Sequence, residues 1–286
     1  MKGTINELRR GFIAALEPLY GHREATGMLD LLLDKCFGIS RLSLIVEQDA
    51  TLSDAQCRLL ESYVNQLLEN RPVQHIIGYV DFCDCVIKVG PDVLIPRPET
   101  AEMVSMIAER WSRKAPARVV DVCTGSGCIA VSLAKKFPDA KVTAIELSEK
   151  ALEQAAANAE LNKVDVGFVK ADVLCQETEI SSDDVDLVVS NPPYICLSER
   201  QMMQSNVLDY EPGMALFVPD DDALVFYRSI LKKSARCLRK GGEVWFEINE
   251  SKREEMDDLC RSLDFSAEFY TDINGKWRFC RAWLNS

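Results

Sequence analysis

Histidine is scarce in this chain, which has only His22 and His75 among its 286 residues. The eleven cysteines are scattered singly. Cys83 and Cys85 are separated by one residue, which is the wrong spacing for a zinc knuckle or a redox pair. Neither histidine lies near a cysteine pair, so we expect no metal site. We interpret the cysteines as reduced core residues of a cytoplasmic protein.

Long apolar runs are also missing. No stretch approaches the roughly 20 apolar residues that a membrane span requires. The N-terminal segment carries Arg9 and Arg10 within an amphipathic pattern and lacks the apolar core of a signal peptide. We therefore expect neither a membrane segment nor a signal peptide.

Positive charge is in the minority, with 33 lysines and arginines against 45 aspartates and glutamates and a net charge of −12. The first 76 residues follow the same balance and offer no basic stripe. Proteins that bind DNA or RNA usually show such a stripe, because they neutralise phosphates. The composition therefore predicts no direct nucleic-acid binding.

Length and composition favour a globular chain of two domains, since 47% of the 286 residues are hydrophobic. The first seventy residues show apolar positions at helical spacing, and Ser53 with Gln56 forms a capping box at the start of one helix. The inner face expected for that helix is Cys57, Leu60, Val64, Leu67 and Leu68. The simplest interpretation is a small helical bundle.

After the helical segment, the spacing of apolar residues changes from helical to alternating. Residues 79–89 read as paired strands, and the loop Leu94–Thr100 follows with two prolines. Pro98 suits the first turn of a helix whose inner face is Met103, Val104, Ile107 and Trp111.

After Pro116 the chain repeats β-α units, and Asn274-Gly275 joins the last two strands as a tight hairpin. Ser148 is the expected N-cap of the helix that ends at Asn162. The expected strands are 118–122, 141–146, 166–171, 185–189, 243–248, 267–271 and 277–284. A parallel sheet that ends in an antiparallel hairpin resembles the Rossmann-like, seven-stranded α/β sheet of class I S-adenosylmethionine-dependent methyltransferases, here preceded by a helical bundle domain.

A glycine-containing turn, Cys123–Gly127, follows the first of these strands. Gly125 and Gly127 alone are weak evidence, because any turn between a strand and a helix can need such residues. Three acids at successive strand ends beside the turn strengthen the case for an adenosyl cofactor. Asp121 is placed to face the amino group of a methionine moiety, Glu146 to bind two ribose hydroxyls, and Asp172 to accept from an adenine amino group.

The segment Asn191-Pro192-Pro193-Tyr194 ends the buried strand 185–189. In an open α/β sheet, ligands bind at that edge. The Asn191 Oδ1 atom and the Pro192 carbonyl are suitable acceptors for both N–H groups of a planar amide or adenine amine, and Tyr194 can stack on the planar group. Together with the turn, this motif predicts methylation of an exocyclic nitrogen without a metal or a histidine base.

The chain resembles the release factor glutamine N5-methyltransferases, the HemK/PrmC family, over essentially its whole length. The resemblance rests on the segments 71–78, 94–100, 121–127, 190–194, 209–212 and 240–242. The loop Leu94–Thr100 discriminates best, because Asn-Pro-Pro-Tyr also occurs in adenine-N6 DNA methyltransferases. These enzymes remain the alternative, although they should carry a basic target-recognition region. A non-catalytic binding module would tolerate loss of Asn191, which is present.

The resemblance implies a helical domain at residues 1–77 that binds the release factor, a β-hairpin linker at 78–95 and a methyltransferase domain at 96–286. It implies S-adenosylmethionine as cofactor and, as substrate, the glutamine of the Gly-Gly-Gln motif in class 1 peptide chain release factors. The implied cofactor contacts are Cys123, Thr124, Gly125, Ser126, Gly127, Glu146, Asp172, Val173 and Asn191, and the implied substrate contacts are Asn191, Pro192, Pro193 and Tyr194.

The chain departs from the family pattern at two positions. Cys123 stands where glycine is usual, which we expect to tighten the turn and weaken cofactor affinity. Glu146 stands where aspartate is usual, which keeps the charge.

Overall fold

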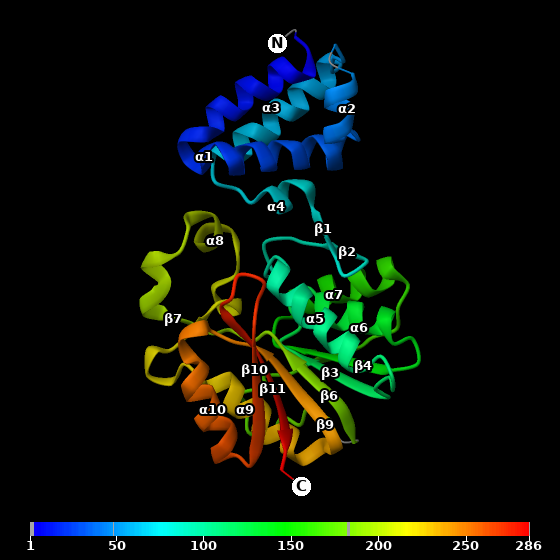
Figure 1. The fold of residues 1–286 in the computed structure, drawn as a ribbon, viewed down its shortest axis with the longest axis vertical. Helices are drawn as coiled ribbons and strands as arrows, with labels where there is room; N and C mark the ends of the chain where they lie inside the picture. Colours follow the sequence, from blue (N-terminus) through cyan, green and yellow to red (C-terminus); the bar gives the residue numbers. More distant parts are fainter. Residues whose placement is uncertain (1–2, 48, 182–183, 286) are drawn as a thin grey trace. The chain divides into compact units, whose positions relative to one another are not determined.

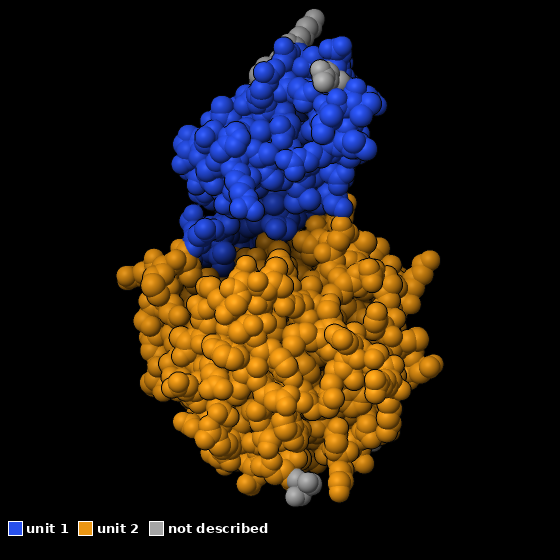
Figure 2. All heavy atoms as spheres, viewed as in Figure 1, with its two compact units in different colours: residues 1–78, 204–210 blue, residues 79–203, 211–286 orange. Residues whose placement is uncertain are grey.

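The computed structural model describes residues 3–47, 49–181 and 184–285. These residues form two compact units, shown in different colours in Figure 2. The helical unit comprises Met1–Gly78 with Gln204–Tyr210, and the sheet unit comprises Tyr79–Met203 with Glu211–Ser286. In the part of the chain that is described, no helix is long and apolar enough to cross a membrane.

The helical unit contains α1 (Ile5–Phe37), α2 (Arg41–Val46), α3 (Asp54–Leu68), α4 (Val73–Ile77) and α8 (Ser205–Tyr210) (Figure 1). Its core collects leucines from α1 and α3, among them Leu16, Leu29 and Leu60. The backbone of α1 leaves the helical conformation at Gly21, which has φ 74°. The buried apolar residues of α1 therefore form two groups, Ile5 to Leu16 before this break and Ala25 to Leu33 after it.

The predicted capping box of α3 is confirmed. The Ser53 hydroxyl accepts from the Gln56 backbone N–H, and the Gln56 side chain accepts from the Ser53 backbone N–H. The predicted inner face is also confirmed apart from Leu68, which was wrong. Leu68 is 39% exposed, because as the last residue of the helix it falls beyond the buried stripe.

The sheet unit is built on a mixed sheet of seven strands in the order β10-β11-β9-β6-β3-β4-β5 (Figure 1). The parallel strands are β3 (Arg118–Val122), β4 (Lys141–Glu146), β5 (Gly167–Lys170), β6 (Val185–Ser190) and β9 (Leu238–Glu247). The antiparallel end is formed by β10 (Phe265–Thr271) and β11 (Trp277–Leu284). This is the predicted seven-stranded class I methyltransferase sheet.

Helices cover both faces of the sheet. One core joins α5 (Pro98–Arg110), α6 (Cys128–Lys136) and α7 (Glu149–Asn162) to one face, and the other joins α9 (Val225–Cys237) and α10 (Arg253–Ser262) to the opposite face. Pro98 begins α5 and the Ser148 hydroxyl caps α7, as predicted. The smaller elements are η1 (Leu197–Met202), η2 (Gly213–Ala215), η3 (Asp220–Asp222), η4 (Glu250–Lys252) and the parallel pair β7 (Ile195–Cys196) and β8 (Phe217–Val218).

The predicted β-hairpin, β1 (Tyr79–Phe82) with β2 (Cys85–Lys88), belongs to the sheet unit. Asn158 of α7 accepts from the Lys88 N–H and donates to the Lys88 carbonyl, so the hairpin is hydrogen-bonded to the sheet unit's own helix. The turn between β10 and β11 is longer than Asn274-Gly275 alone. The Asp272 N–H bonds the Lys276 carbonyl, and Gly275 has φ 77°.

Candidate active site

A cavity of about 180 Å³ opens at the carboxyl ends of β3, β4 and β6. The side chains of Val93, Ile145, Val173 and Phe226 give it apolar walls, and a small number of polar groups converge on it. Ligands of open α/β sheets bind at this edge. An apolar cavity with a few polar groups is the usual form of a small-molecule site.

The turn Cys123–Gly127 forms one wall of the cavity through Cys123, Thr124, Gly125 and Ser126. Three of its residues have left-handed backbones, with φ 60° at Cys123, 54° at Gly125 and 79° at Gly127. Glycine adopts this conformation without strain, whereas a residue with a Cβ atom does not. The backbone thus explains why glycine suits position 123. The predicted effect of Cys123 on cofactor affinity stays a prediction.

The Cys123 thiol is unsuited to act as a nucleophile. Burial, with the negative charges of Glu146 and Asp121, raises the pKa of Cys123 well above its usual value. The thiolate, which is the reactive form, is therefore disfavoured.

Asp121 ends beneath the turn, fully buried, and does not line the cavity. Its Oδ2 atom accepts from the Thr124 hydroxyl at 2.5 Å and from the Ala130 N–H at 3.1 Å. Its Oδ1 atom is buried and has no partner among the described residues. Burial raises the pKa of Asp121 to about 7, against the lowering effect of these two hydrogen bonds. Asp121 therefore shapes the turn and keeps one acceptor unused.

Glu146 and Asp172 line the cavity, at the ends of β4 and after β5. Glu146 Oε1 accepts from the N–H groups of Leu147 and Ser148, and its Oε2 accepts from the Gly125 N–H at 3.0 Å. Asp172 Oδ1 accepts from the Leu174 N–H at 2.8 Å. Since a carboxylate accepts about four hydrogen bonds, both groups retain acceptor capacity for hydroxyl or amino groups.

The motif Asn191–Tyr194 follows β6, whose last residue Ser190 donates to the Val122 carbonyl. Asn191 and Pro193 line the cavity, whereas Pro192 and Tyr194 do not. Asn191 Nδ2 donates to Thr100 Oγ1 at 3.1 Å, and Oδ1 has no hydrogen-bond partner among the described residues. The amide therefore offers one acceptor to a ligand in the cavity.

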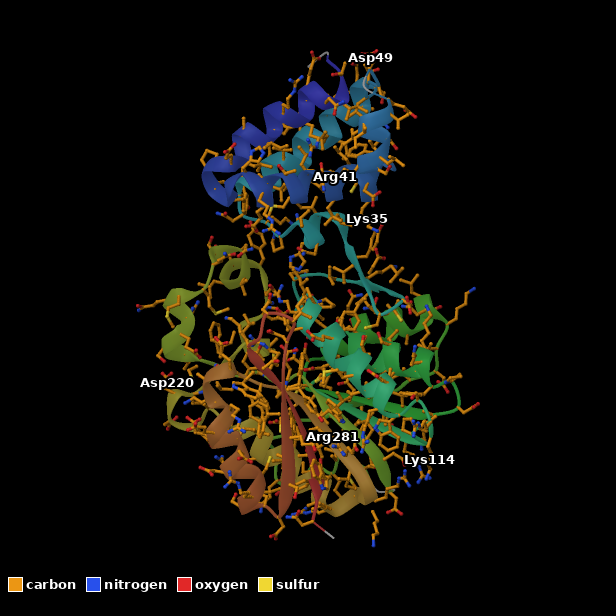
Figure 3. All side chains as sticks on the ribbon, viewed as in Figure 1. Lys35, Arg41, Asp49, Lys114, Asp220 and Arg281 are labelled. Atoms are coloured by element: carbon orange, nitrogen blue, oxygen red, sulfur yellow. The ribbon has the colours of Figure 1, made fainter. Side chains whose placement is uncertain are left out.

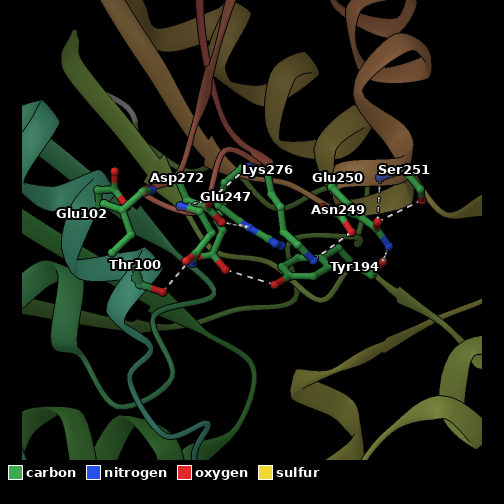
Figure 4. A network of polar contacts seen from close by, with 12 residues as sticks. Thr100, Glu102, Tyr194, Glu247, Asn249, Glu250, Ser251, Asp272 and Lys276 are labelled. Atoms are coloured by element: carbon green, nitrogen blue, oxygen red, sulfur yellow. Dashed lines mark hydrogen bonds and ion pairs between the residues drawn. The ribbon is translucent and has the colours of Figure 1, made fainter.

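Tyr194 is hydrogen-bonded to Glu247, the last residue of β9 (Figure 4). The Tyr194 hydroxyl donates to Glu247 Oε1 at 3.0 Å, and the Thr100 hydroxyl donates to Oε2 at 2.6 Å. Sequence reasoning missed Glu247. The available signal was the same as for Asp121: an acid at the carboxyl end of a buried apolar strand.

Sequence reasoning also missed Glu211, which fixes the loop Leu94–Thr100. The Glu211 side chain is 1% exposed, pairs with Arg97 Nη2 at 2.5 Å and accepts from the Ile95 N–H at 2.9 Å. Arg97 lines the cavity. In the sequence, the segment 209–212 contributes only to the family resemblance.

The cavity thus brings together nine of the expected site residues, namely Cys123, Thr124, Gly125, Ser126, Glu146, Asp172, Val173, Asn191 and Pro193. The expected residues outside its lining are Asp121, Gly127, Pro192 and Tyr194. Each of these four adjoins a lining residue in the chain or bonds one. Their direct contact with ligands stays a prediction.

These residues fit S-adenosylmethionine, which combines an amino acid end that carries an ammonium group, a ribose diol and an adenine. Glu146 and Asp172 supply acceptors at two strand ends, and Asp121 has an unsatisfied carboxylate oxygen beside the turn. A Cβ atom at Gly125 would meet nothing within 4 Å, so the backbone there is open to a ligand.

Comparisons with known proteins show what this chain is similar to. The model described as the PrmC N-terminal domain matches residues 7–78, and the methyltransferase small domain matches residues 100–208. The release factor glutamine methyltransferase of Bacteroides thetaiotaomicron is 40% identical over 94% of this chain and 96% of its own. The release factor glutamine methyltransferase of Flavobacterium psychrophilum is 37% identical over 97% of this chain and 98% of its own. The solved structure of a ribosomal protein L11 methylase from Lactobacillus delbrueckii subsp. bulgaricus has a TM-score of 0.50 at 20% identity, covering 70% of this chain and 86% of that one.

The sheet with its antiparallel end, and the cavity at its strand tips, define a class I S-adenosylmethionine-dependent methyltransferase. The two relatives match nearly the full length of this chain and identify its family. The chain belongs to the release factor glutamine methyltransferase family.

Proposed function

We propose that this chain methylates the side-chain amide nitrogen of the glutamine in the Gly-Gly-Gln motif of class 1 peptide chain release factors. The observation that carries the proposal is the Asn191 amide, which lines the cavity and has its nitrogen bonded to Thr100. The names of the two full-length relatives support the same substrate. Because release factors act in translation, we propose the cytoplasm as the place of action.

The chemical difficulty is that an amide nitrogen is a poor nucleophile, since its lone pair is conjugated with the carbonyl. The rotation barrier of an amide, about 18–20 kcal/mol, gives the scale of that conjugation. S-adenosylmethionine, when bound, supplies an electrophilic methyl group on a sulfonium sulfur. The protein must therefore weaken the conjugation and aim the nitrogen.

Asn191 meets this requirement by accepting an N–H of the substrate amide at Oδ1, and the Pro192 carbonyl is the proposed second acceptor. Two acceptors on the N–H groups favour a pyramidal nitrogen and stabilise the positive charge that develops there. Tyr194, whose hydroxyl is fixed by Glu247, is the proposed platform for the planar amide. The surplus proton leaves the nitrogen after methyl transfer, so no side-chain base is required.

The test replaces Asn191 with alanine and follows labelled methyl transfer to a purified class 1 release factor, with the site located by peptide mass. We expect turnover to fall by at least roughly 100-fold, as for loss of one preorganised polar group, while cofactor still binds. The matched control is Asn162→Ala. The Asn162 amide also makes hydrogen bonds, with the Val86 N–H and carbonyl groups, but it does not line the cavity. Near-normal turnover in Asn191→Ala would contradict the mechanism.

Protein and nucleic acid are separated as substrates in the same assay. Figure 3 labels side chains of both signs in the sheet unit, Lys114, Arg281 and Asp220, and the chain carries a net charge of −12. Such a surface does not steer DNA phosphates toward the cavity. We expect transfer to the release factor, no transfer when its Gly-Gly-Gln glutamine is changed, and none to duplex or single-stranded DNA. Sequence-dependent labelling of adenine, with the release factor untouched, would favour an adenine-N6 methyltransferase instead.

We further propose that the helical domain, residues 1–77, binds the body of the release factor. Its helix α2 carries three large apolar side chains at 66–72% exposure, Leu42, Ile45 and Val46, and exposed apolar patches often mark protein interaction sites. Ile45→Asp should raise KM for the release factor and leave kcat unchanged. Val169→Asp, on an exposed apolar residue of β5, is the control. An unchanged KM in Ile45→Asp would remove α2 from the docking surface.

A further inference from the structure

Glu247 occupies an unusual position for a carboxylate, at the tip of β9 and 2% exposed. Each of its oxygens accepts a hydroxyl group, Oε2 that of Thr100 at 2.6 Å and Oε1 that of Tyr194 at 3.0 Å (Figure 4). An ionised carboxylate has no proton to donate. In both contacts the hydroxyl is the donor.

This direction determines what Thr100 can offer to its other neighbour. A threonine hydroxyl has one proton, and in Thr100 that proton is used toward Glu247. Toward Asn191, at 3.1 Å, the Thr100 oxygen can only accept. Thr100 lines the cavity, but only 2% of its surface is exposed, so its hydroxyl is largely shielded from water.

The Asn191 amide has an NH₂ branch, which donates, and a carbonyl branch, which accepts. Because Thr100 accepts, the NH₂ branch must face Thr100. The carbonyl branch, Oδ1, is then left as the acceptor that Asn191 presents to a ligand. A flipped amide would place two acceptors, Oδ1 and the Thr100 oxygen, against each other.

We propose that Glu247 and Thr100 are positioning residues that fix the orientation of the Asn191 amide, so that Oδ1 accepts from the substrate nitrogen. This inference rests on the proposed function for its consequence in catalysis. The same carboxylate fixes the Tyr194 hydroxyl, so one buried group orients both polar side chains of the Asn-Pro-Pro-Tyr motif. Neither positioning residue is assigned a contact with the reacting atoms.

The groups around Glu247 shift its pKa in opposite directions. Burial raises the pKa of Glu247, and the nearby Glu99 acts in the same direction. The hydrogen bonds from Thr100 and Tyr194 and the positive charge of Arg278 oppose that increase. Thr100 also lies in the first turn of α5, and a helix N-terminus favours a negative charge beside it.

The test compares two substitutions of Thr100 in the full-length chain. Thr100→Val keeps the shape but removes the hydroxyl, and Thr100→Ser keeps the hydroxyl. We expect kcat to fall roughly tenfold in Thr100→Val, the range for one net hydrogen bond, with cofactor affinity and KM for the release factor changed less than about twofold. Thr100→Ser should restore kcat to within about threefold of the wild type.

A double-mutant cycle separates positioning from a general loss of structure. If Thr100 acts through the amide, then Thr100→Val should have no further effect on kcat in the Asn191→Ala background. The full tenfold loss in that background, or a failure of Thr100→Ser to restore kcat, would overturn the proposal.

A measurement independent of activity keeps the proposal distinct from the proposed function. In asparagine-labelled protein, the Asn191 NH₂ signals are assigned by their loss in Asn191→Ala. We expect these protons to exchange with water at least roughly tenfold faster in Thr100→Val than in the wild type or Thr100→Ser. Equal exchange would overturn the inferred contact. The expected exchange pattern, with a wild-type enzyme that leaves release factors unmethylated, would instead contradict the proposed function alone.

Discussion

Asp121 is a fully buried carboxyl whose pKa lies near 7, and replacing it with asparagine should remove a pH dependence of stability. In the folded protein, Asp121 holds the turn through Oδ2, while Oδ1 is buried without a partner among the described residues. Burial raises its pKa from the usual 3.8 to about 7. Asparagine keeps one oxygen for Thr124 and Ala130 and cannot ionise.

The sign follows from proton binding in the two states. Between pH 4 and 7 the folded protein holds a proton on Asp121 that the unfolded chain has released. Stability from this group is therefore fully present below the unfolded pKa and is lost as pH rises through the folded pKa. With pKa values of 3.8 and about 7, the loss between pH 5 and pH 8 is about 2.6 kcal/mol.

The assay is urea unfolding of the cofactor-free wild type and Asp121→Asn at pH 5 and pH 8. The free energy of unfolding of the wild type, relative to the variant, should fall by about 2.6 kcal/mol over that range. Any constant effect of the buried asparagine NH₂ group cancels in this difference. A fall of less than about 1 kcal/mol would refute the reasoning.

Asp272→Asn is the control for the opposite sign. Hydrogen bonds from the Lys276 and Asn274 N–H groups and the Arg278 charge lower the pKa of Asp272. The stability that Asp272 contributes is lost only as pH falls through that lowered pKa, so the free energy of unfolding of the wild type relative to Asp272→Asn should be the same at pH 5 and pH 8.

Cofactor titrations test the role of Asp121 in binding. If Asp121 receives the cofactor's ammonium group, affinity should rise through pH 7 in the wild type and not in Asp121→Asn.

Substitutions at two further positions test the residues that support the site, by their midpoints of urea unfolding. In Gly127→Ala the new Cβ atom would lie 2.9 Å from the Ala155 Cβ in a left-handed backbone, so we expect a loss of about 3 kcal/mol. Gly241→Ala, with the same φ but nothing within 4 Å, should lose about 1 kcal/mol, and equal losses would contradict the close approach. Glu211→Ala should lose about 3 kcal/mol, since it leaves the buried Ile95 N–H without an acceptor, whereas Glu211→Gln should lose about 1 kcal/mol. Equal losses in the two Glu211 variants would show that the Ile95 contact contributes little.

Local signals in the sequence predicted most of the fold. Ser53 and Ser148 cap helices where expected, because capping depends on residues only three positions apart. Pro98 begins α5 for the same local reason. The error at Leu68 arose because periodicity does not say where a helix leaves the core. The last hairpin has a longer turn than expected, since the Asp272 side chain accepts from the Asn274 and Lys276 N–H groups.

Contacts that join distant parts of the chain escaped prediction. The Thr100–Glu247 hydrogen bond spans 147 residues, and the Ile95–Glu211 hydrogen bond spans 116. No spacing rule connects such positions. Composition supplied the acids and the motif supplied Asn191, but only the strand order brings the tips of β3, β6 and β9 to neighbouring places on one edge.

The acids at these strand tips show why position alone does not define a role. Asp121, Glu146 and Glu247 all lie at the carboxyl ends of strands of the same sheet, yet each carboxylate is used differently. Glu146 lines the cavity and accepts backbone N–H groups, which leaves it free to bind a ligand as well. Asp121 is buried under the turn with an unused oxygen, so its contribution to the free energy of unfolding depends on pH. Glu247 receives two hydroxyl protons and thereby sets the direction of hydrogen bonding in the groups it contacts. A strand tip places an acid at the ligand-binding edge, and burial and the donors around it then decide whether it binds, supports the turn or orients a neighbour.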